Sequence, residues 1–439
     1  MVPKTRLFYI ASILVTVTTL IFICGATISR ANSPVEIRFW HAMGRSRGRV
    51  LNELVDRFNR ANPGIVVKAE YIQSENKRYG NDYNALYAKI LENLAQNEPP
   101  DVAQVYENWT TQYVGIDAIV PVEEFMSAQD RASLNDLVPV LLKANTFPNN
   151  EGQQKIYTLP FNKSIFVLYY NKNIFRELGL KPPATWDELR HCAKVIAKKK
   201  GVPGLAFLPN VDIFGHYLYS YGGQYIANNK AAFGGKLGVD DLNYWVNLVH
   251  KDMSATPTFE ASRLFANGKA GMYIESTSRI GGFDEARSSG LDFGVLPIPK
   301  GTTQASQMAG TNLAIFRGDN DIEKHNAAYK FILYMCSPEV TVHWATQTGY
   351  LPVRKSAINS PEYQAYVKRH PEYGVGLKSM DKATIQPRVP VWESIRSILD
   401  DTMFKALGRK CDSVTAIREA SDTSDQLLYS VGGFSADNR

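Results

Sequence analysis

Hydrophobic residues change their spacing in a regular way along the first hundred residues of the chain. Residues 35–40 alternate apolar and charged side chains over most of their length, which predicts a strand, and the apolar positions within residues 50–58 recur at the spacing of one helix face. The same order follows in residues 65–71 (strand), residues 86–94 (helix) and residues 101–106 (strand). Strands that alternate with helices predict an α/β fold with an open sheet and helices on both faces.

The segment from Leu159 to Leu189 carries the most local information. Residues 162–164 are polar and predict a turn, and the apolar run 165–170 that follows predicts a strand. A short helical segment then ends at Gly179, before the Pro182-Pro183 pair. Thr185 stands three residues before Glu188, which is the spacing of a capping box and predicts the start of the next helix.

Further signals continue the α/β pattern in the second half of the chain. Residues 268–274 predict a turn and a strand, residues 293–299 a strand broken by prolines, and residues 310–316 another strand. Ser337-Pro338-Glu339 is typical of a helix start, and residues 349–353 predict a loop that rejoins the sheet.

Length and charge narrow the classes of protein. At 439 residues the chain is too long for one ordinary core, so two domains are expected. It is 44% hydrophobic and 21% charged, with a formal net charge of +6. Removing residues 1–31, which carry three basic and no acidic side chains, leaves +3. This charge is too small to indicate a nucleic-acid partner.

Residues 1–31 have the pattern of an export signal. Lys4 and Arg6 precede the mostly apolar run 7–24, and Ser29 and Ala31 stand at positions −3 and −1 for cleavage after Ala31. Two alternatives stay open, because Cys24-Gly25 suggests lipidation and an apolar run of this length nearly spans a bilayer. In each case the rest of the chain is exported, to the periplasm or the outer face of the plasma membrane.

Cysteine and motif content argues against metal sites and catalysis. Beyond the signal, Cys192, Cys336 and Cys411 are far apart and form no C-x-x-C pair, which favours free thiols and leaves one disulfide open. The phosphate-loop, dinucleotide, hydrolase-elbow and zinc-protease motifs are all missing. We therefore predict no cofactor, no metal and no enzymatic activity, with a secreted hydrolase as the alternative from another class.

Eight segments, each weak alone, stand in the order found in one protein family. They are EIRFWHAMG (36–44), LVDRFNRANPGIVV (54–67), PPDVAQVYE (99–107), the segment 159–189, FANGKAGMYIES (265–276), MAGTNLAIF (308–316), YKFILYMCSPE (329–339) and TGYLPVRKSA (348–357). Together they resemble the extracellular solute-binding proteins of bacterial ABC importers. The resemblance implies a monomer with two α/β lobes, hinge strands between them, and a ligand cleft. Its partners would be the small ligand and permease subunits driven by a separate ATPase.

The resemblance also implies a division into lobes and a set of ligand contacts. The first lobe would comprise residues 35–145 and 290–333, and the second residues 146–289 and 334–439. Within the family the chain looks most like the glycerol-3-phosphate-binding branch, whose cleft positions match these residues: Tyr83, Tyr350 and Arg388 at the phosphate, Glu107 at ligand hydroxyls, the cleft serines Ser164 and Ser276, and Gly310, whose backbone would approach the ligand.

The identity of the ligand stays open at this point. A carboxylate repels phosphate, so Glu107 is expected at the opposite end of the ligand from Arg388. Residues 203–221 lack the tryptophan pair that covers the ligand in the glycerol-3-phosphate branch, and Trp109 is the best candidate for stacking on a ligand. We predict glycerol-3-phosphate or a glycerophosphodiester, with a neutral sugar or glycoside as the alternative.

Overall fold

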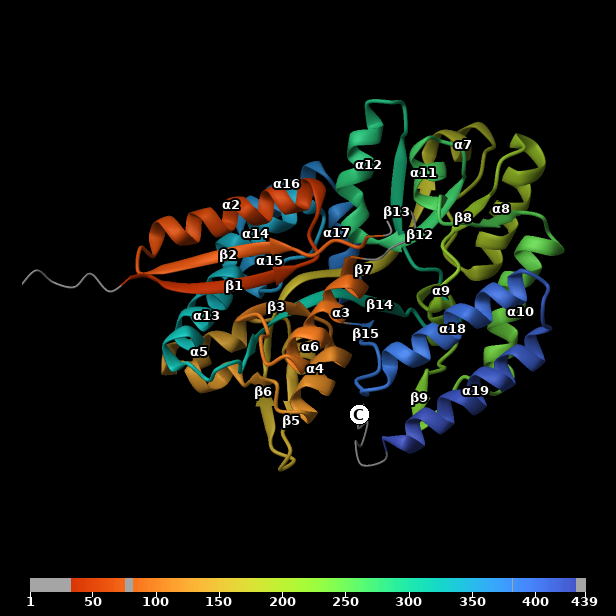
Figure 1. Ribbon diagram of the computed structural model, residues 1–439. Coiled ribbons are helices and arrows are strands. Elements are labelled where there is room, and N and C mark those ends of the chain that lie inside the picture. The colour runs from red at the N-terminus through yellow and green to blue at the C-terminus, as the bar shows by residue number, and fades with distance from the viewer. Residues whose placement is uncertain (1–32, 76–81, 381, 432–439) are drawn as a thin grey trace, which may run out of the picture.

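A computed structural model describes residues 33–75, 82–380 and 382–431. Two groups of helices and strands lie side by side, and the long strands β7 (Thr158–Asn171) and β14 (Ser306–Phe316) run between them (Figure 1). The predicted export signal, with Cys24, lies outside the described residues. No helix within the described ranges is long and apolar enough to cross a bilayer.

The predicted alternation of strands and helices at the start of the chain is confirmed. It consists of β1 (Val35–His41), α2 (Arg45–Ala61), β2 (Ile65–Tyr71), α3 (Asp82–Ala95) and β3 (Val102–Val105). Strand β1 lies between β2 and β3 and pairs in parallel with both. The carboxyl ends of the three strands therefore meet at one edge of the sheet, where open α/β sheets bind ligands.

Alternate residues of β1 face two different helix layers. Phe39 packs edge-on against Phe331 of helix α13 (Ile322–Met335), in a cluster that also contains the apolar face of α2. Its neighbour Trp40 belongs to the cluster on the other face, together with Leu86 of α3. This alternation follows from the two-residue repeat of a strand and places helices on both faces.

Strands β7 and β14 join the two halves into one sheet, with the order β11-β8-β12-β7-β14-β3-β1-β2. The first part of β7 pairs antiparallel with β14, and its last part pairs with β12 (Met272–Ser276) and β13 (Phe293–Pro297). The predicted polar turn at residues 162–164 is therefore wrong. These three residues are buried inside β7, where the side chains of Asn162 and Lys163 find partners within the protein.

The second half has its own core. Strands β8 (Leu205–Phe207) and β11 (Ala255–Pro257) extend the sheet beyond β12. The helices that surround it are α8 (Trp186–Lys200), α9 (Val211–Ser220), α10 (Lys236–His250), α18 (Trp392–Leu407) and α19 (Ser413–Ser430). The buried Trp186, Trp245 and Trp392 belong to this core. Helix α8 begins with the predicted capping box.

Shorter elements complete the described chain. They are α4 (Glu107–Gly115), β4 (Ile119–Val120), η1 (Val122–Phe125), α5 (Ala128–Ser133), η2 (Leu134–Asp136), α6 (Pro139–Ala144), β5 (Thr146–Pro148), β6 (Gln154–Ile156), α7 (Lys172–Glu177), β9 (Ile226–Ala227), β10 (Lys230–Ala231), α11 (Ala261–Ala266), η3 (Thr277–Arg279), α12 (Ile280–Arg287), α14 (Pro338–Thr348), α15 (Lys355–Ile358), α16 (Pro361–Arg369), α17 (Tyr373–Met380) and β15 (Ala383–Thr384). Cys192, Cys336 and Cys411 are free thiols, as predicted.

The contacts of α14 bear on where one lobe ends and the other begins. This helix packs against α2 and α13, which belong to the half that contains β1. The division of the chain into lobes stays a prediction, and these contacts favour moving residues 338–348 from the second lobe to the first.

Candidate functional site

A buried ion pair forms the floor of the candidate site. Glu107 begins α4 directly beyond β3, at the carboxyl edge of the sheet, and is 8% exposed. Its Oε1 accepts a hydrogen bond from Lys163 Nζ at 2.6 Å and another from Asn312 Nδ2 at 3.2 Å. Lys163 lies on β7 and Asn312 on β14, so three neighbouring strands supply the pair and its extra donor.

Burial dominates the electrostatics of this floor. It lowers the pKa of Lys163, and the negative charge of Glu107 opposes that shift. Lys163 Nζ also donates to the Gly310 carbonyl oxygen at 3.3 Å. A charge without a partner is expensive in such a place, so these bonds are what allow Lys163 to lie at 1% side-chain exposure.

A network of amides positions Tyr83 beside the floor. Asn162 Nδ2 on β7 donates to the Tyr83 hydroxyl oxygen at 3.0 Å. Asn162 Oδ1 accepts from Gln104 Nε2 at 3.1 Å and from the Thr311 hydroxyl. The amide orientation of Asn162 is thereby fixed, and the hydroxyl of Tyr83, which accepts from Asn162, also interacts with Tyr350. Burial raises the pKa of Tyr83 well above its ordinary value, so the hydroxyl stays protonated.

Gly310 marks the closest approach between β7 and β14. Its φ is +93°, and a Cβ atom there would stand 1.8 Å from the Asn162 carbonyl oxygen. The pairing of the two strands shifts register directly after it, between Thr311 and Asn312. The crossing of the strands is therefore enough to require glycine at this position, without any ligand near its backbone.

Tyr350 lies in a second polar cluster, where the two halves meet. Its ring stacks on Trp344 at a centroid distance of 5.7 Å, and it is 3% exposed. The guanidinium carbon of Arg47, in the first turn of α2, stands 5.5 Å from the centre of the Tyr350 ring. Arg47 Nη2 also donates to the Ser278 carbonyl oxygen at 3.2 Å, across to η3.

The predicted serines occupy different environments. Ser276 ends β12, and its hydroxyl shares a 2.8 Å hydrogen bond with the Ser278 hydroxyl, which places it next to the Arg47 contact. Ser164 lies inside β7 opposite Ala309 and is 2% exposed. Ser276 thus belongs to the Tyr350 cluster, and Ser164 to the strand that connects the two halves.

Arg388 makes contacts that the sequence did not predict. Its Nη1 donates to the carbonyl oxygens of Lys143 at 3.2 Å and Thr146 at 2.7 Å, and the guanidinium lies over the Phe147 ring at 5.1 Å. Burial lowers the pKa of Arg388, and the charge of Glu107 opposes this shift. The charge of Glu107 therefore acts on Arg388, and the placement of the two groups at opposite ends of a ligand stays a prediction.

Trp109 is not arranged as a platform for a ligand. It is 1% exposed, its ring stacks on Tyr87 at 4.9 Å, and Tyr106 meets it edge-on at 4.8 Å. Its Nε1 donates to Glu393 Oε1 at 3.0 Å, and Asn108 Nδ2 donates to the same oxygen at 2.8 Å. Neighbouring rings occupy the positions where a ligand would stack.

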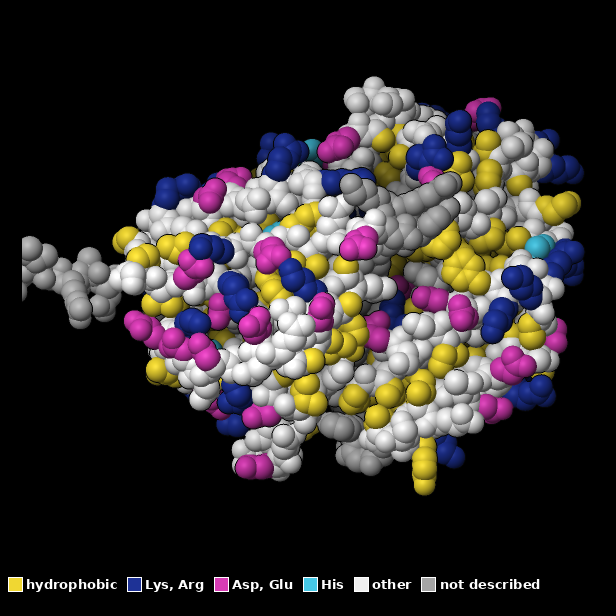
Figure 2. All heavy atoms as spheres, in the orientation of Figure 1, with side chains coloured by type: hydrophobic (Ala, Val, Ile, Leu, Met, Phe, Trp, Pro, Cys, Tyr) yellow, Lys and Arg dark blue, Asp and Glu magenta, His cyan; other side chains and the backbone are white. Residues whose placement is uncertain are grey.

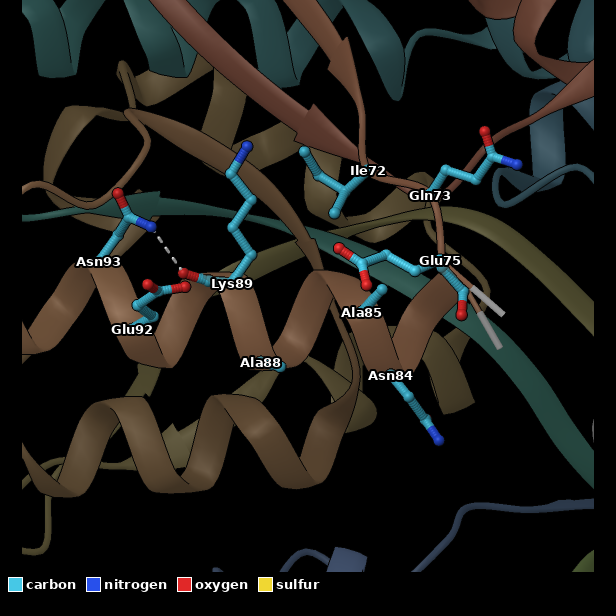
Figure 3. A pocket seen from close by; sticks show the side chains of 10 residues that line it. Ile72, Gln73, Glu75, Asn84, Ala85, Ala88, Lys89, Glu92 and Asn93 are labelled. Carbon is cyan, nitrogen blue, oxygen red and sulfur yellow. Dashed lines mark hydrogen bonds between the residues drawn. The ribbon is translucent and has the colours of Figure 1, made fainter. Parts of the chain in front are cut away.

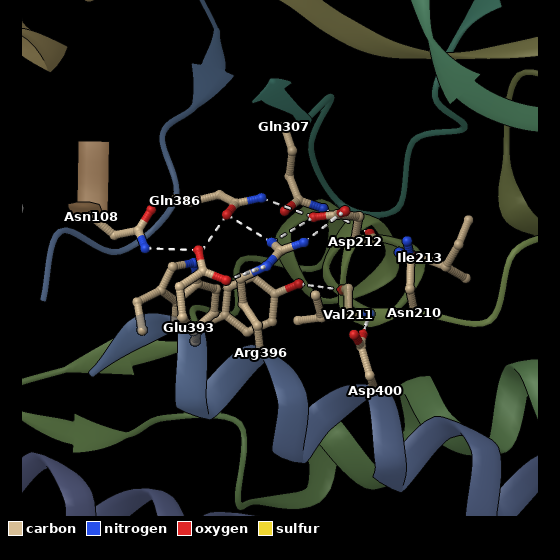
Figure 4. A network of polar contacts seen from close by, with 12 residues as sticks. Asn108, Asn210, Val211, Asp212, Ile213, Gln307, Gln386, Glu393, Arg396 and Asp400 are labelled. Atoms are coloured by element: carbon tan, nitrogen blue, oxygen red, sulfur yellow. Dashed lines mark hydrogen bonds and ion pairs between the residues drawn. The ribbon is translucent and has the colours of Figure 1, made fainter. Parts of the chain in front are cut away.

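Glu393 belongs to a larger polar network that lines the second half (Figure 4). Asp212, at the start of α9, accepts from Arg396 Nη1 at 3.0 Å, from Arg396 Nη2 at 3.1 Å and from Gln386 Nε2 at 2.8 Å. Burial opposes ionisation of Asp212, but Arg396 makes the net shift of its pKa downward. This fork-shaped pairing keeps both charges in place below the surface.

The surface carries a separate open groove of about 820 Å³. It lies between residues 72–75 and the exposed face of α3, and Lys89 and Asn93 point along it (Figure 3). Figure 2 shows acidic and basic side chains interspersed over this face, which is hollowed between the two halves.

Sequence reasoning missed several members of the site. Lys163 and Asn162 were predicted to lie in a turn. Arg47 lies in a polar stretch that contains glycine, serine and arginine and that predicts a solvent-exposed start of a helix. For Asn162 and Lys163, the one signal in the sequence was that the polar triplet 162–164 directly precedes the apolar run 165–170. Across the described ranges, no group of three or more His, Cys, Asp and Glu side chains is arranged to hold a metal ion.

Residues 53–371 match the family model for bacterial extracellular solute-binding proteins. The chain belongs to this family. It is 27% identical over 433 residues to the sn-glycerol-3-phosphate-binding periplasmic protein UgpB of Salmonella typhimurium, which covers 92% of this chain and 94% of the relative. The UgpB of a Yersinia pestis strain is 25% identical over 430 residues, with 91% and 94% covered.

Solved structures of two-lobed solute-binding proteins share the fold. UgpB from Mycobacterium tuberculosis in complex with glycerophosphocholine has a TM-score of 0.79 and 22% identity, covering 90% of this chain and 98% of that one. Maltose-bound MalE3 of T. maritima has a TM-score of 0.77 and 23% identity, covering 90% and 100%. The predicted two-lobed α/β fold is confirmed.

Membership of the family settles the general activity. The protein is the solute-binding subunit of an ABC importer and not an enzyme, so the hydrolase alternative is wrong. Such subunits bind a small molecule and work with permease and ATPase subunits, and the named UgpB relatives are periplasmic.

Proposed function

We propose that this solute-binding protein captures sn-glycerol-3-phosphate or a glycerophosphodiester between its lobes. One observation carries the proposal: Tyr350 and the Ser276–Ser278 hydroxyl pair, from separate elements, gather around the Arg47 guanidinium. Together they offer neutral and charged donors to the oxygens of one anionic group. The similarity to glycerol-3-phosphate-binding relatives over 92% of the chain supports the same ligand class.

The other end of the ligand is a polyol in this proposal. Glu107 Oε1 already accepts from Lys163 and Asn312, while its Oε2 has no hydrogen bond from any described residue. That oxygen is an acceptor for ligand hydroxyls. Ser164, Gly310 and Arg388 stay in the predicted ligand set, although each has an internal role in this structure.

Ligand binding should hold the two lobes together. Glu107 and Tyr83 lie on the β1 side of the molecule and Ser276 on the other, so a ligand that touches all three favours the closed arrangement. We propose that the protein works as a monomer which presents this closed form to its permease. Small-angle scattering should show compaction on adding a tight ligand, and no compaction would count against closure.

A neutral sugar is the second candidate. Several proteins of the same fold were solved with oligosaccharides, among them MalE3 with maltose and GacH with acarbose. Residues 203–221 also lack tryptophan, unlike the glycerol-3-phosphate branch. Buried tyrosines such as Tyr106 and Tyr219 would then supply the apolar surface that sugar rings need.

Calorimetric titration distinguishes the two candidates. The purified protein is titrated with sn-glycerol-3-phosphate, glycerophosphocholine, glucosylglycerol, sucrose and trehalose. Saturable one-to-one binding of a phosphate ester supports the proposal. Binding of a sugar, with no heat from either phosphate ester, would replace it with the neutral-sugar function and leave the family unchanged.

A further inference from the structure

Arg47 has an unusual environment for a half-buried arginine. It lies in the first turn of α2, with its guanidinium against the Tyr350 ring and one N–H bonded to the Ser278 carbonyl oxygen. Its positive charge reaches the buried hydroxyl of Tyr83, where it opposes the upward shift of the tyrosine pKa. Among the described residues, no carboxylate lies within ion-pair distance of Arg47.

Two other arginines of this region have a carboxylate that acts on them. Arg396 forms a two-pronged pair with Asp212. Burial alone would lower the pKa of Arg279, but the Glu275 carboxylate raises it. Partial burial of a guanidinium costs free energy unless a negative charge or a set of acceptors replaces water. Arg47 has a single carbonyl acceptor for five N–H donors, so its environment is incomplete.

We propose that Arg47, rather than Arg388, is the main cationic contact for the anionic group of the ligand. The inference rests on the proposed function, because it takes a phosphate ester as the solute. The phosphate would lie against Arg47 with Tyr83, Tyr350 and the Ser276–Ser278 pair as neutral donors. Arg388 would be a secondary contact, because its Nη1 already donates to the carbonyl oxygens of Lys143 and Thr146.

The geometry explains why an arginine suits this position. A guanidinium offers two parallel N–H groups to a phosphate and can stack on an aromatic ring at the same time. The Arg47 guanidinium carbon stands 5.5 Å from the centre of the Tyr350 ring, and Trp344 stacks on the same ring. A lysine would keep the charge but lose both the fork and the stacking.

The experiment compares four variants at three arginines, one of them Arg47→Lys, in binding to sn-glycerol-3-phosphate, glycerophosphocholine and inorganic phosphate. Arg47→Gln removes the proposed contact and Arg388→Gln removes the alternative. Arg49→Gln is the matched control, because it makes the same charge change on the same helix at an exposed position. Calorimetry at 20, 100 and 300 mM NaCl gives both Kd and its salt dependence, and thermal melts verify that each variant folds.

We expect Arg47→Gln to weaken binding of the phosphate esters on the order of ten- to a hundredfold and to flatten the salt dependence. Arg47→Lys should recover part of the affinity. Arg388→Gln should flatten the salt dependence less than Arg47→Gln does, and Arg49→Gln should stay within about twofold of wild type. These results together would support the proposal.

Two outcomes would overturn it, and they differ. If the wild type binds a phosphate ester while Arg47→Gln keeps its affinity and Arg388→Gln loses it with its salt slope, Arg388 is the anion contact and the proposed function stands. If the folded wild type binds no phosphate ester at any salt concentration, the proposed function fails and the inference fails with it.

Discussion

The floor of the cleft and the contacts between its walls are both built from charges below the surface, but they are assembled differently. In the floor, Lys163 comes from β7, Asn312 from β14 and Glu107 from the end of β3. These three strands pair within one sheet. Between the walls, Glu393 reaches from α18 to Asn108 on α4, with no strand pairing to support it. In the proposed opening of the lobes, the floor contacts would persist and the wall contacts would break.

The floor contacts and the wall contacts should therefore affect different quantities, the stability of the fold and the closure of the lobes. A charge pair inside a sheet contributes to the folded state whether or not a ligand is present. A contact that exists only when the lobes are together changes the balance between open and closed forms, and so changes apparent affinity. Substitutions in the floor should therefore act on unfolding, and substitutions in the wall should act on binding.

The largest expected effect is that of Lys163→Met in the floor. The variant leaves the Glu107 carboxylate buried without its cation, which should lower the free energy of unfolding by about 3–5 kcal/mol. Urea denaturation followed by circular dichroism measures the loss. Lys172→Met is the control, because Lys172 directly follows β7, is partly exposed and lies 3.8 Å from each of its two acidic partners; it should cost less than about 1 kcal/mol. Equal losses in both variants would contradict a special role for the floor pair.

Gly310→Ala tests the strand crossing at the floor. The added methyl group would meet the Asn162 carbonyl oxygen and must also adopt a positive φ, so we expect a loss of about 2–4 kcal/mol in unfolding free energy. Gly318→Ala is the matched control, since Gly318 has a φ of +48° but nothing within 4 Å of the added atom. Strain without a clash should cost about 1 kcal/mol there. The difference between the two losses of unfolding free energy measures the cost of the clash. Equal losses would show that the two strands separate easily.

Glu393→Ala tests the wall. It removes the acceptor for Asn108 Nδ2 and Trp109 Nε1, so the closed form loses two charge-assisted hydrogen bonds. We expect ligand affinity to fall about tenfold while the unfolding free energy changes by less than about 1 kcal/mol. Asp401→Ala, an exposed position on the same helix, should change neither. A large loss of stability with unchanged affinity would show that Glu393 contributes to folding, like the floor residues, and not to closure.

Asp400→Asn has the smallest expected effect and depends on pH. Burial raises the pKa of Asp400 to about 6. The positive charge of Arg396 opposes this shift, and the negative charges of Asp212 and Glu393 add to it. The folded protein therefore holds this proton more tightly than the unfolded chain, and its contribution to stability is lost as the pH rises from about 4 to 6. The amide can still accept from Val211 N, as the carboxylate does at 2.6 Å. We expect the variant to be more stable by about 1–2 kcal/mol at pH 7.5, with the gain fading towards pH 4.

Local sequence patterns predicted most helices and strands, because each pattern acts through its own neighbours. The apolar face within residues 50–58 became the buried side of α2, and Thr185 and Glu188 formed the capping box of α8. The triplet 162–164 misled the prediction. Polar residues favour a turn when water is their partner, but here Glu107, Tyr83 and the strand β14 supply the partners from far along the chain.

The sequence by itself determined the family, the alternating elements and the position of Glu107 beyond a strand end, since all of these depend on short stretches of chain. Only the tertiary structure decided how the charges are paired. In the folded protein, Lys163 pairs with Glu107, and Arg388 donates to backbone carbonyl oxygens. Two tyrosine rings pack against Trp109, and no carboxylate of the described residues lies within ion-pair distance of Arg47. The pairing of a buried charge depends on which groups surround it in space, and residues such as Arg47 and Ser278 are separated by 231 positions in the chain.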